Sequence, residues 1–569
     1  MHPFRPENLR SLPRRWAGNA SGGTAITFAL VFTFLVAPLT TIAVDLFLFS
    51  SQRAKLQDAL DAATLWAARA NTTRADEIQA LGARALTTNL VLMSKDPAQL
   101  RSSTFLLETD AEGQKVTGSA VLDPYTIFNW CHEWTGDAWC LLPDQVEATS
   151  EVRRGIDAIE VALVLDNTGS MQSEGRLAAL KTAAKAMVDD LAELASRPNA
   201  AADAVKISLV PFSSTVRIRA NLTLTSYDTT THSGGGVPDY MDGRARAIPV
   251  ASDLFSGTSK SDRFALLKAI GQPWGGCVES RNAPFDVDDT APNPSDPATL
   301  YIPYFWPDEA DNPSSGNKPS YNDYLADGGG SDYRSKLRRV QKYSTTTLKS
   351  PTTFTSLMDS TLYGGPYNRG PNAGCPVQPM IPLTTTLTSV KTAIDGMTAM
   401  GETHIPIGLA WGWNTLSPTG PVATGAAYSN DDVKKFVVLM TDGDNTMNQI
   451  SRASYGNTNA SLYGSYGYVW QGRLPDPDST STPPVGMATS SSSADRTAAI
   501  DERLALLCSN IKARNIVIYV VGLKVSAASR SRLQACASGG SYWDVDDVSD
   551  LTGAFAAIAA SIKDLRISR

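Results

Sequence analysis

The stretch from Ile159 to Ser170, IEVALVLDNTGS, decides how most of this chain folds. Its opening residues, up to the first Asp, are almost all apolar, which is typical of a strand buried on both faces. Apolar residues then recur at helical spacing from Leu177 to Leu191, and residues 205–212 are predicted to form the next strand. This strand–helix–strand order predicts an α/β fold with a parallel sheet.

The same pattern resumes after about residue 380. The expected elements are a helix over 387–397, a strand over 436–440 that runs into Thr441 and Asp442, a helix over 504–511, strands over 516–521 and 542–543, and a final helix over 551–562. Two long segments, about 221–380 and 445–492, interrupt the pattern with many Gly, Pro, Ser and Thr residues. We therefore expect residues 156–569 to form a doubly wound α/β domain with two insertions.

The N-terminal part has the pattern of a membrane anchor. Residues 1–21 carry four arginines, and residues 22–49 are almost wholly apolar, which is long enough for a transmembrane helix. The arginines favour a cytoplasmic N-terminus, so that everything after Phe49 lies on the other side of the membrane. A cleaved signal peptide is the alternative, although the apolar run is longer than such peptides need. Residues 50–155 are rich in helix formers and then show a hairpin pattern over 104–121, which predicts a helical stem and a small α+β region.

Composition narrows the class of protein. The chain has 569 residues, of which 42% are hydrophobic and 19% charged, as in folded proteins of several units. A net charge of −7 provides no overall basic field for nucleic acid. Six cysteines in a chain expected outside the cytoplasm favour disulfides over six reduced thiols, and the long spacings disfavour zinc. Pairing of nearest neighbours, one of many possible arrangements, would join Cys131 to Cys140, Cys277 to Cys375 and Cys508 to Cys536.

Polar residues stand where two predicted parallel strands end. Asp166 and Asp442 close these strands, and doubly wound sheets bind ligands at this carboxyl edge. The turn after Asp166 can bring Thr168 and Ser170 to the same side as the carboxylate, and Thr403 precedes a helix in a distant loop. Carboxylate and hydroxyl oxygens suit Mg²⁺, with Mn²⁺ or Ca²⁺ as alternatives. We predict that these five residues bind a divalent cation, and we predict no catalytic residue.

The set resembles the metal-ion-dependent adhesion site (MIDAS) of von Willebrand factor A domains, which has Asp-x-Ser/Thr-x-Ser, a later Thr, and a strand ending in Asp. The residues after Asp166, Asn-Thr-Gly-Ser-Met, resemble those of TadG-like A domains. The resemblance covers about 156–220 and 381–569. It implies a bound cation with one coordination position open to a carboxylate of a partner protein.

The N-terminus carries a second resemblance. The pair Gly18-Asn19, the apolar span with Asp45 near its end, and the segment Arg53–Ala63 resemble the N-terminus of TadE/TadG-like proteins of tight-adherence (Flp-type) pilus systems. The resemblance implies a single-pass inner-membrane protein, with its bulk in the periplasm, that binds other pilus-assembly subunits and is not an enzyme. The chain departs from processed prepilins, because no Glu lies between Glu7 and Glu77.

Other interpretations are open at this point. A surface adhesin would use the same site for a host or matrix ligand. The Asp166 turn also resembles the phosphorylated turn of P-type ATPases, with Lys434 or Lys435 as the charge stabiliser, but Asn167 replaces the usual Lys. Alternatively, the Asp, Ser and Thr residues only form turns and helix caps. Residues Asp286–Asp289 lack most of a calcium-loop signature, so we expect an exposed acidic loop there.

Overall fold

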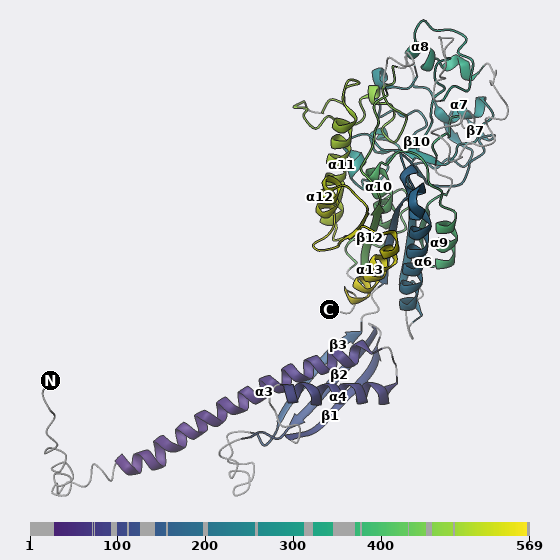
Figure 1. Cartoon of the computed structure of the whole chain (residues 1–569). Helices are drawn as coiled ribbons and strands as arrows, with labels where there is room; N and C mark the ends of the chain where they lie inside the picture. Colours follow the sequence, from purple (N-terminus) through teal and green to yellow (C-terminus); the bar gives the residue numbers. More distant parts are fainter. Residues whose placement is uncertain are drawn as a thin grey trace, which may run out of the picture. The chain divides into compact units, whose positions relative to one another are not determined.

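The computed structural model describes residues 28–70, 72, 74–92, 99–110, 113–125, 143–154, 158–196, 203–255, 260–311, 322–344, 370–375, 378–430, 432–450, 458–481 and 484–565. The chain divides into two compact units, residues 1–155 together with 569, and residues 156–568. Figure 1 labels many of their helices and strands.

A long helix dominates the first unit. Among the residues that the structure describes, Phe28–Arg69 is the one helix long and apolar enough to cross a membrane. It contains a π-helical turn, η2 (Phe32–Val36), directly before α3 (Ala37–Arg69). Pro38 lies at this junction, where a widened turn accommodates the missing backbone donor. At about 1.5 Å per residue the helix is about twice as long as a bilayer core is thick, so only part of it can lie in lipid.

The second half of α3 belongs to a small α+β core. Leu56, Leu60 and Ala63 are buried there against α4 (Ala75–Leu92) and a three-stranded sheet. The strands β1 (Leu100–Asp110), β2 (Gly113–Leu122) and β3 (Val146–Arg154) are antiparallel in the order β1-β2-β3. The predicted hairpin is therefore confirmed, and so is the helical stem. The Cys131–Cys140 segment lies outside the described residues.

Glutamine side chains cover the backbone at the edges of this sheet. Gln79 of α4 donates from Nε2 to the carbonyl oxygen of Ser103 (3.0 Å), and its Oε1 accepts from the Phe105 N–H (2.7 Å) in the edge strand β1. Gln57 of α3 donates to the carbonyl oxygen of Thr149 (2.9 Å) in β3, the other edge strand. These amides occupy backbone groups that would otherwise be available to pair with a strand of another molecule.

The second unit is built on a mixed sheet. Its main strands are β4 (Ala158–Asp166), β5 (Val205–Phe212), β11 (Ile381–Thr384), β12 (Val433–Thr441), β13 (Val517–Leu523) and β14 (Tyr542–Val545). They lie in the order β11-β5-β4-β12-β13-β14; all are parallel except β11, which is antiparallel to β5. Numbered along the chain this is the order 3-2-1-4-5-6 of doubly wound sheets, so the predicted fold class is confirmed.

Helices cover both faces of the sheet (Figure 1). Ile159, Val161 and Leu163 of β4 pack in the core of one face, whereas Ala162 and Val164 pack in the core of the other, which explains why the strand is almost wholly apolar. The helices of the first face are α6 (Arg176–Ala195), α9 (Leu387–Asp395) and α13 (Leu551–Leu565), and those of the second are α10 (Ile405–Leu416), α11 (Ser493–Ala513) and α12 (Ala527–Cys536).

The first insertion extends the sheet and contributes buried residues to the core on the α10 face of the sheet. Strand β6 (Val216–Arg217) directly precedes the insertion, whose own short elements are β7 (Tyr227–Asp228), β8 (Ser233–Gly234), α7 (Arg263–Ala269), β9 (Cys277–Glu279), β10 (Ile302–Pro303) and α8 (Tyr333–Leu337). Strands β6, β9 and β10 continue the sheet beyond β5. An ion pair between Glu279 and Arg473, and a hydrogen bond from the Tyr468 hydroxyl to Glu309 (2.7 Å), join this insertion to the second one.

The expectation of an exposed acidic loop at Asp286–Asp289 is wrong. Asp286 forms a buried pair with Arg503 of α11 (2.6 Å). Asp289 is also buried and accepts hydrogen bonds from the hydroxyls of Ser417 (2.7 Å) and Tyr428 (2.6 Å). These carboxylates anchor the first insertion to the α10–α11 face.

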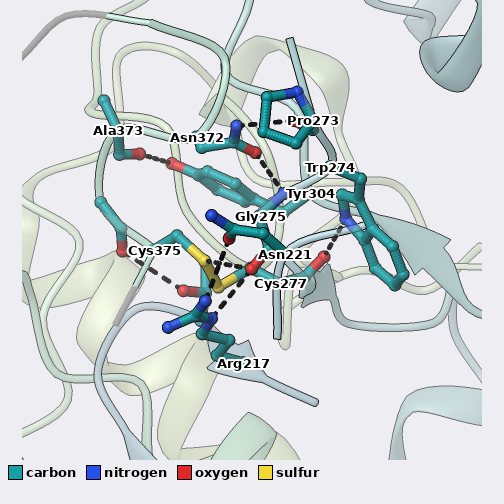
Figure 2. Close-up of a disulfide and its surroundings, with 12 residues drawn as sticks. Arg217, Asn221, Pro273, Trp274, Gly275, Cys277, Tyr304, Asn372, Ala373 and Cys375 are labelled. Carbon is teal, nitrogen blue, oxygen red and sulfur yellow. Dashed lines mark hydrogen bonds between the residues drawn. A yellow bond between two sulfur atoms is a disulfide. The ribbon is translucent and has the colours of Figure 1, made fainter. Parts of the chain in front are cut away.

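Two of the three expected disulfides lie within the described residues. Cys277 of β9 pairs with Cys375, and Cys508 of α11 pairs with Cys536 of α12. Figure 2 shows the first bridge, where Arg217 donates to the carbonyl oxygen of Gly275 (2.9 Å) beside the sulfur atoms. This bridge joins β9, inside the first insertion, to a residue near the C-terminal end of that insertion.

Candidate metal centre

The candidate centre lies at the carboxyl edge of the sheet. Asp166 is the last residue of β4, and Asp442 directly follows β12. The two strands are parallel neighbours in which Met440 is opposite Leu165, so both aspartates reach the same edge. A 3-10 turn, η5 (Gly169–Gly175), leads from Asp166 to α6.

Hydrogen bonds link four of the five predicted residues. The two oxygens of Asp166 accept from the Thr168 N–H (2.8 Å) and from the Thr441 hydroxyl (2.7 Å). The hydroxyls of Thr168 and Ser170 lie 3.0 Å apart, and Ser170 donates to Oδ1 of Asp442 (2.6 Å). Two carboxylates and two hydroxyls thus form one cluster at the strand ends.

Thr403 lies on a loop that contacts the first one. The carbonyl oxygen of Gly401 accepts from the Gly169 N–H (3.0 Å), and Gly401 has a φ of +77°, where a side chain would be strained. Thr403 is 6% exposed, and its N–H donates to the Thr446 hydroxyl (3.0 Å). Within the described parts of the chain, no hydrogen bond joins the Thr403 side chain to the other four predicted residues. The structure therefore brings the two loops into contact through the backbone of Gly401 and Gly169.

The second insertion contacts the loop that contains Thr403 through the neighbouring residue His404. His404 is fully buried, with Nδ1 2.6 Å from the Ser465 hydroxyl and Nε2 2.9 Å from the carbonyl oxygen of Thr446. Burial lowers the pKa of His404 to about 4, so the ring is neutral. This histidine is a structural bridge between the insertion and the edge of the sheet.

The charges at the centre favour a cation. Burial, followed by the negative charge of Asp442, raises the pKa of Asp166 to about 7. A divalent cation would stabilise the ionised form of both carboxylates. Ser170 is exposed whereas Asp166, Thr168 and Asp442 are buried, so the cluster is open on the side of Ser170. The residues thus fit a cation that accepts hydroxyl oxygens; no cluster of three or more His, Cys, Asp or Glu side chains suited to a metal occurs in the described residues.

Two further residues belong to the cluster and were not predicted. Thr441 donates to Asp166, and Arg176 donates from Nη1 to Oδ2 of Asp442 (2.9 Å). A signal for Arg176 was available, because it is the first residue of α6, and the positive end of the helix dipole disfavours a cation there. An arginine at the first position of a helix therefore indicates that a carboxylate lies nearby.

The phosphotransfer alternative requires Lys434 or Lys435 close to Asp166, and the structure places both lysines elsewhere. Lys435 is paired with the buried Glu160, to which it is opposite in the register of β12 and β4. Glu160 lies near the start of β4, roughly 20 Å from Asp166 at about 3.3 Å per residue. Lys434 is opposite Ile159 at the same end of the sheet. Neither lysine lies at the carboxyl edge.

Comparisons with known proteins place the chain among distant structures only. No family model and no curated protein matches it. The pilus adhesin SpaC from Lactobacillus rhamnosus GG is similar at 12% identity and a TM-score of 0.29, over 81% of this chain and 34% of that one. The chain thus covers about a third of the length of that adhesin.

Two further solved structures are similar to the chain. The von Willebrand factor domain of the type V pili tip protein Mfa5 from Porphyromonas gingivalis has 12% identity and a TM-score of 0.29, over 72% of this chain and 97% of that one. Proximal thread matrix protein 1 from the mussel byssus, with a zinc-occupied MIDAS motif, has 13% identity and a TM-score of 0.17, over 71% and 96%. The fold assignment therefore rests on the strand order and helix layers of the chain itself, which are those of a doubly wound α/β sheet.

Proposed function

We propose that the chain is a membrane-anchored adhesion protein that binds an acidic group of a partner protein through a divalent cation. The proposed ligands are Asp166, Thr168, Ser170, Thr403 and Asp442. The observation that carries this proposal is the hydrogen-bonded cluster of two carboxylates and two hydroxyls at the carboxyl edge of the sheet. Its donors are all oxygens, which favours Mg²⁺ over softer ions, and Mn²⁺ or Ca²⁺ would use the same atoms.

The chemistry of the donors supports an acidic partner. Bound at this edge, the cation would supply an electrophilic position for a carboxylate oxygen. The protein supplies only two formal negative charges there, so a divalent cation is at most neutralised and not surrounded by excess negative charge. Ser170, the exposed residue of the cluster, marks the side from which a partner would approach.

We further propose that the apolar first half of the helix Phe28–Arg69 is an uncleaved anchor and that the chain after it lies in the periplasm. The arginines before the helix and the two disulfides of the second unit support this orientation. Alkaline phosphatase fused after Arg69 should be active, and an inactive fusion would contradict the orientation.

A role in assembly of a tight-adherence pilus is the second candidate function. It is supported by α3, which continues from the apolar span into a packed α+β unit, as expected for a pilin-like stem. A deletion strain separates the two roles. Loss of pili would favour assembly, whereas normal pili with reduced surface attachment would favour adhesion.

Calorimetric titration of the full chain in detergent with magnesium tests the metal site. We expect one ion per chain for the wild type, none for Asp166→Ala, and wild-type binding for the control Asp546→Ala, whose side chain is 85% exposed. Equal binding by the wild type and Asp166→Ala would place the ion elsewhere. Absence of binding by the wild type would leave the five residues as turn formers.

A further inference from the structure

A guanidinium group lies beside the candidate metal centre. Nη1 of Arg176 is 2.9 Å from Oδ2 of Asp442, whose side chain is fully buried, while the arginine side chain is 16% exposed. The other oxygen of Asp442 accepts from Ser170 (2.6 Å). Asp442 is therefore shared between a hydroxyl of the proposed ligand set and a permanent cation.

Arg176 keeps this position although three features of its local structure raise the free energy of the guanidinium there. The two residues before it, Glu174 and Gly175, have φ angles of 53° and 70°, and the first of these is strained for a residue other than glycine. Nε of Arg176 is buried and has no hydrogen-bond partner in the described structure. The guanidinium also lies at the positive end of the α6 dipole.

Neighbouring charges fix the arginine further. Oε2 of Glu174 is 3.4 Å from Nη2 of Arg176 and 2.6 Å from Nζ of Lys524, which directly follows β13. Charges of alternating sign therefore run from Lys524 through Glu174 and Arg176 to Asp442. The contact between Arg176 and Asp442 is the one that reaches the metal centre. It offsets the cost of the strained backbone, the buried Nε without a partner and the helix dipole.

We propose that Arg176 is a positioning residue that sets the net charge of the metal centre and thereby its preference for a carboxylate ligand. This inference rests on the proposed function and deepens it. Asp166, Asp442 and Arg176 together carry a single negative charge, so a divalent cation leaves the centre with a single positive charge. That charge matches one carboxylate of a partner. Without the arginine the loaded centre would be neutral, would hold the metal more tightly and would attract a carboxylate less.

Neutral and charge-retaining variants of the full chain in detergent test this role. Magnesium affinity is measured by calorimetry, followed by the affinity of the magnesium-loaded protein for glutarate as a minimal carboxylate probe. For Arg176→Gln we expect about tenfold tighter magnesium binding and about tenfold weaker glutarate binding, the size of effect expected for a close charge pair. Arg176→Lys retains the charge and should stay within about threefold of the wild type in both affinities. Arg514→Gln, which removes a 53% exposed guanidinium, should behave as the wild type.

The possible outcomes are separable. If Arg176→Gln does not fold, Arg176→Met keeps an apolar stem without the charge and carries the same expectations. Unchanged affinities in the neutral variants, or weaker magnesium binding, would overturn the role of Arg176 while leaving the metal site in place. If neither the wild type nor the neutral variants bind magnesium, the proposed metal site itself is overturned, and this role with it.

Discussion

The disulfide between Cys277 and Cys375 should contribute more to stability than the one between Cys508 and Cys536. The first bridge spans 98 residues and the second 28. In the chain-entropy model these loops correspond to about 4.7 and about 3.6 kcal/mol of unfolding free energy at 25 °C. The difference of about 1 kcal/mol reflects the longer segment whose freedom in the unfolded state is reduced.

Paired alanine variants measure this difference. The contacts around the first bridge, such as those of Arg217 and Asn372 with Gly275, do not need the sulfur atoms, so the insertion should stay folded in Cys277→Ala/Cys375→Ala (Figure 2). Urea unfolding of the full chain, followed by circular dichroism, should give a lower stability for this variant than for Cys508→Ala/Cys536→Ala. Equal or reversed losses would refute the argument from loop length.

Three other predictions concern charge and edge strands. With EDTA present, the free energy of unfolding should fall as pH rises from about 4 to about 7. The pKa of Asp166 is raised to about 7, so the folded state retains a proton that the unfolded chain releases near the usual pKa of aspartate. Asp166→Asn should lose this decline in melting temperature, and a decline of equal size in the variant would contradict the assignment. Lys435→Met should cost about 3 kcal/mol by leaving Glu160 buried without its partner, yet calorimetry should find magnesium binding unchanged. Gln79→Leu should cost about 1–2 kcal/mol by uncapping the Phe105 N–H, and size-exclusion chromatography should detect self-association through the exposed edge; a monomeric variant would show that other groups protect it.

The central strands could be predicted because their physical environment is simple. Parallel strands covered on both faces are largely apolar, and β4, β5, β12 and β13 have that pattern apart from a few polar residues, such as the paired Glu160 and Lys435. The edge strand β11 and the short strands of the first insertion have two to four residues each, too few to show a period. Helix α12 was missed because its sequence, AASRSRLQAC, has Leu533 as its one large aliphatic residue and therefore shows no apolar period.

The candidate site could be predicted only from the order of the strands and of the loops at their ends. The ends of neighbouring parallel strands must meet, which placed Asp166 beside Asp442. Contacts between side chains distant in sequence were not accessible in this way. Arg176 and Asp442 are 266 residues apart, and Asp286 is neutralised by Arg503, 217 residues further along the chain. The acidic composition of residues Asp286–Asp289 therefore predicted exposure where the fold produces burial.

The most direct test of the central claim is the position of the ion itself. Crystals of the chain grown with Mn²⁺, which accepts the same oxygen ligands as Mg²⁺, would reveal it in an anomalous difference map. We predict one strong peak at the carboxyl edge of the sheet, at about 2.1 Å from the hydroxyl oxygens of Thr168 and Ser170. A map without a peak there, or with manganese only at other acidic side chains, would contradict the account.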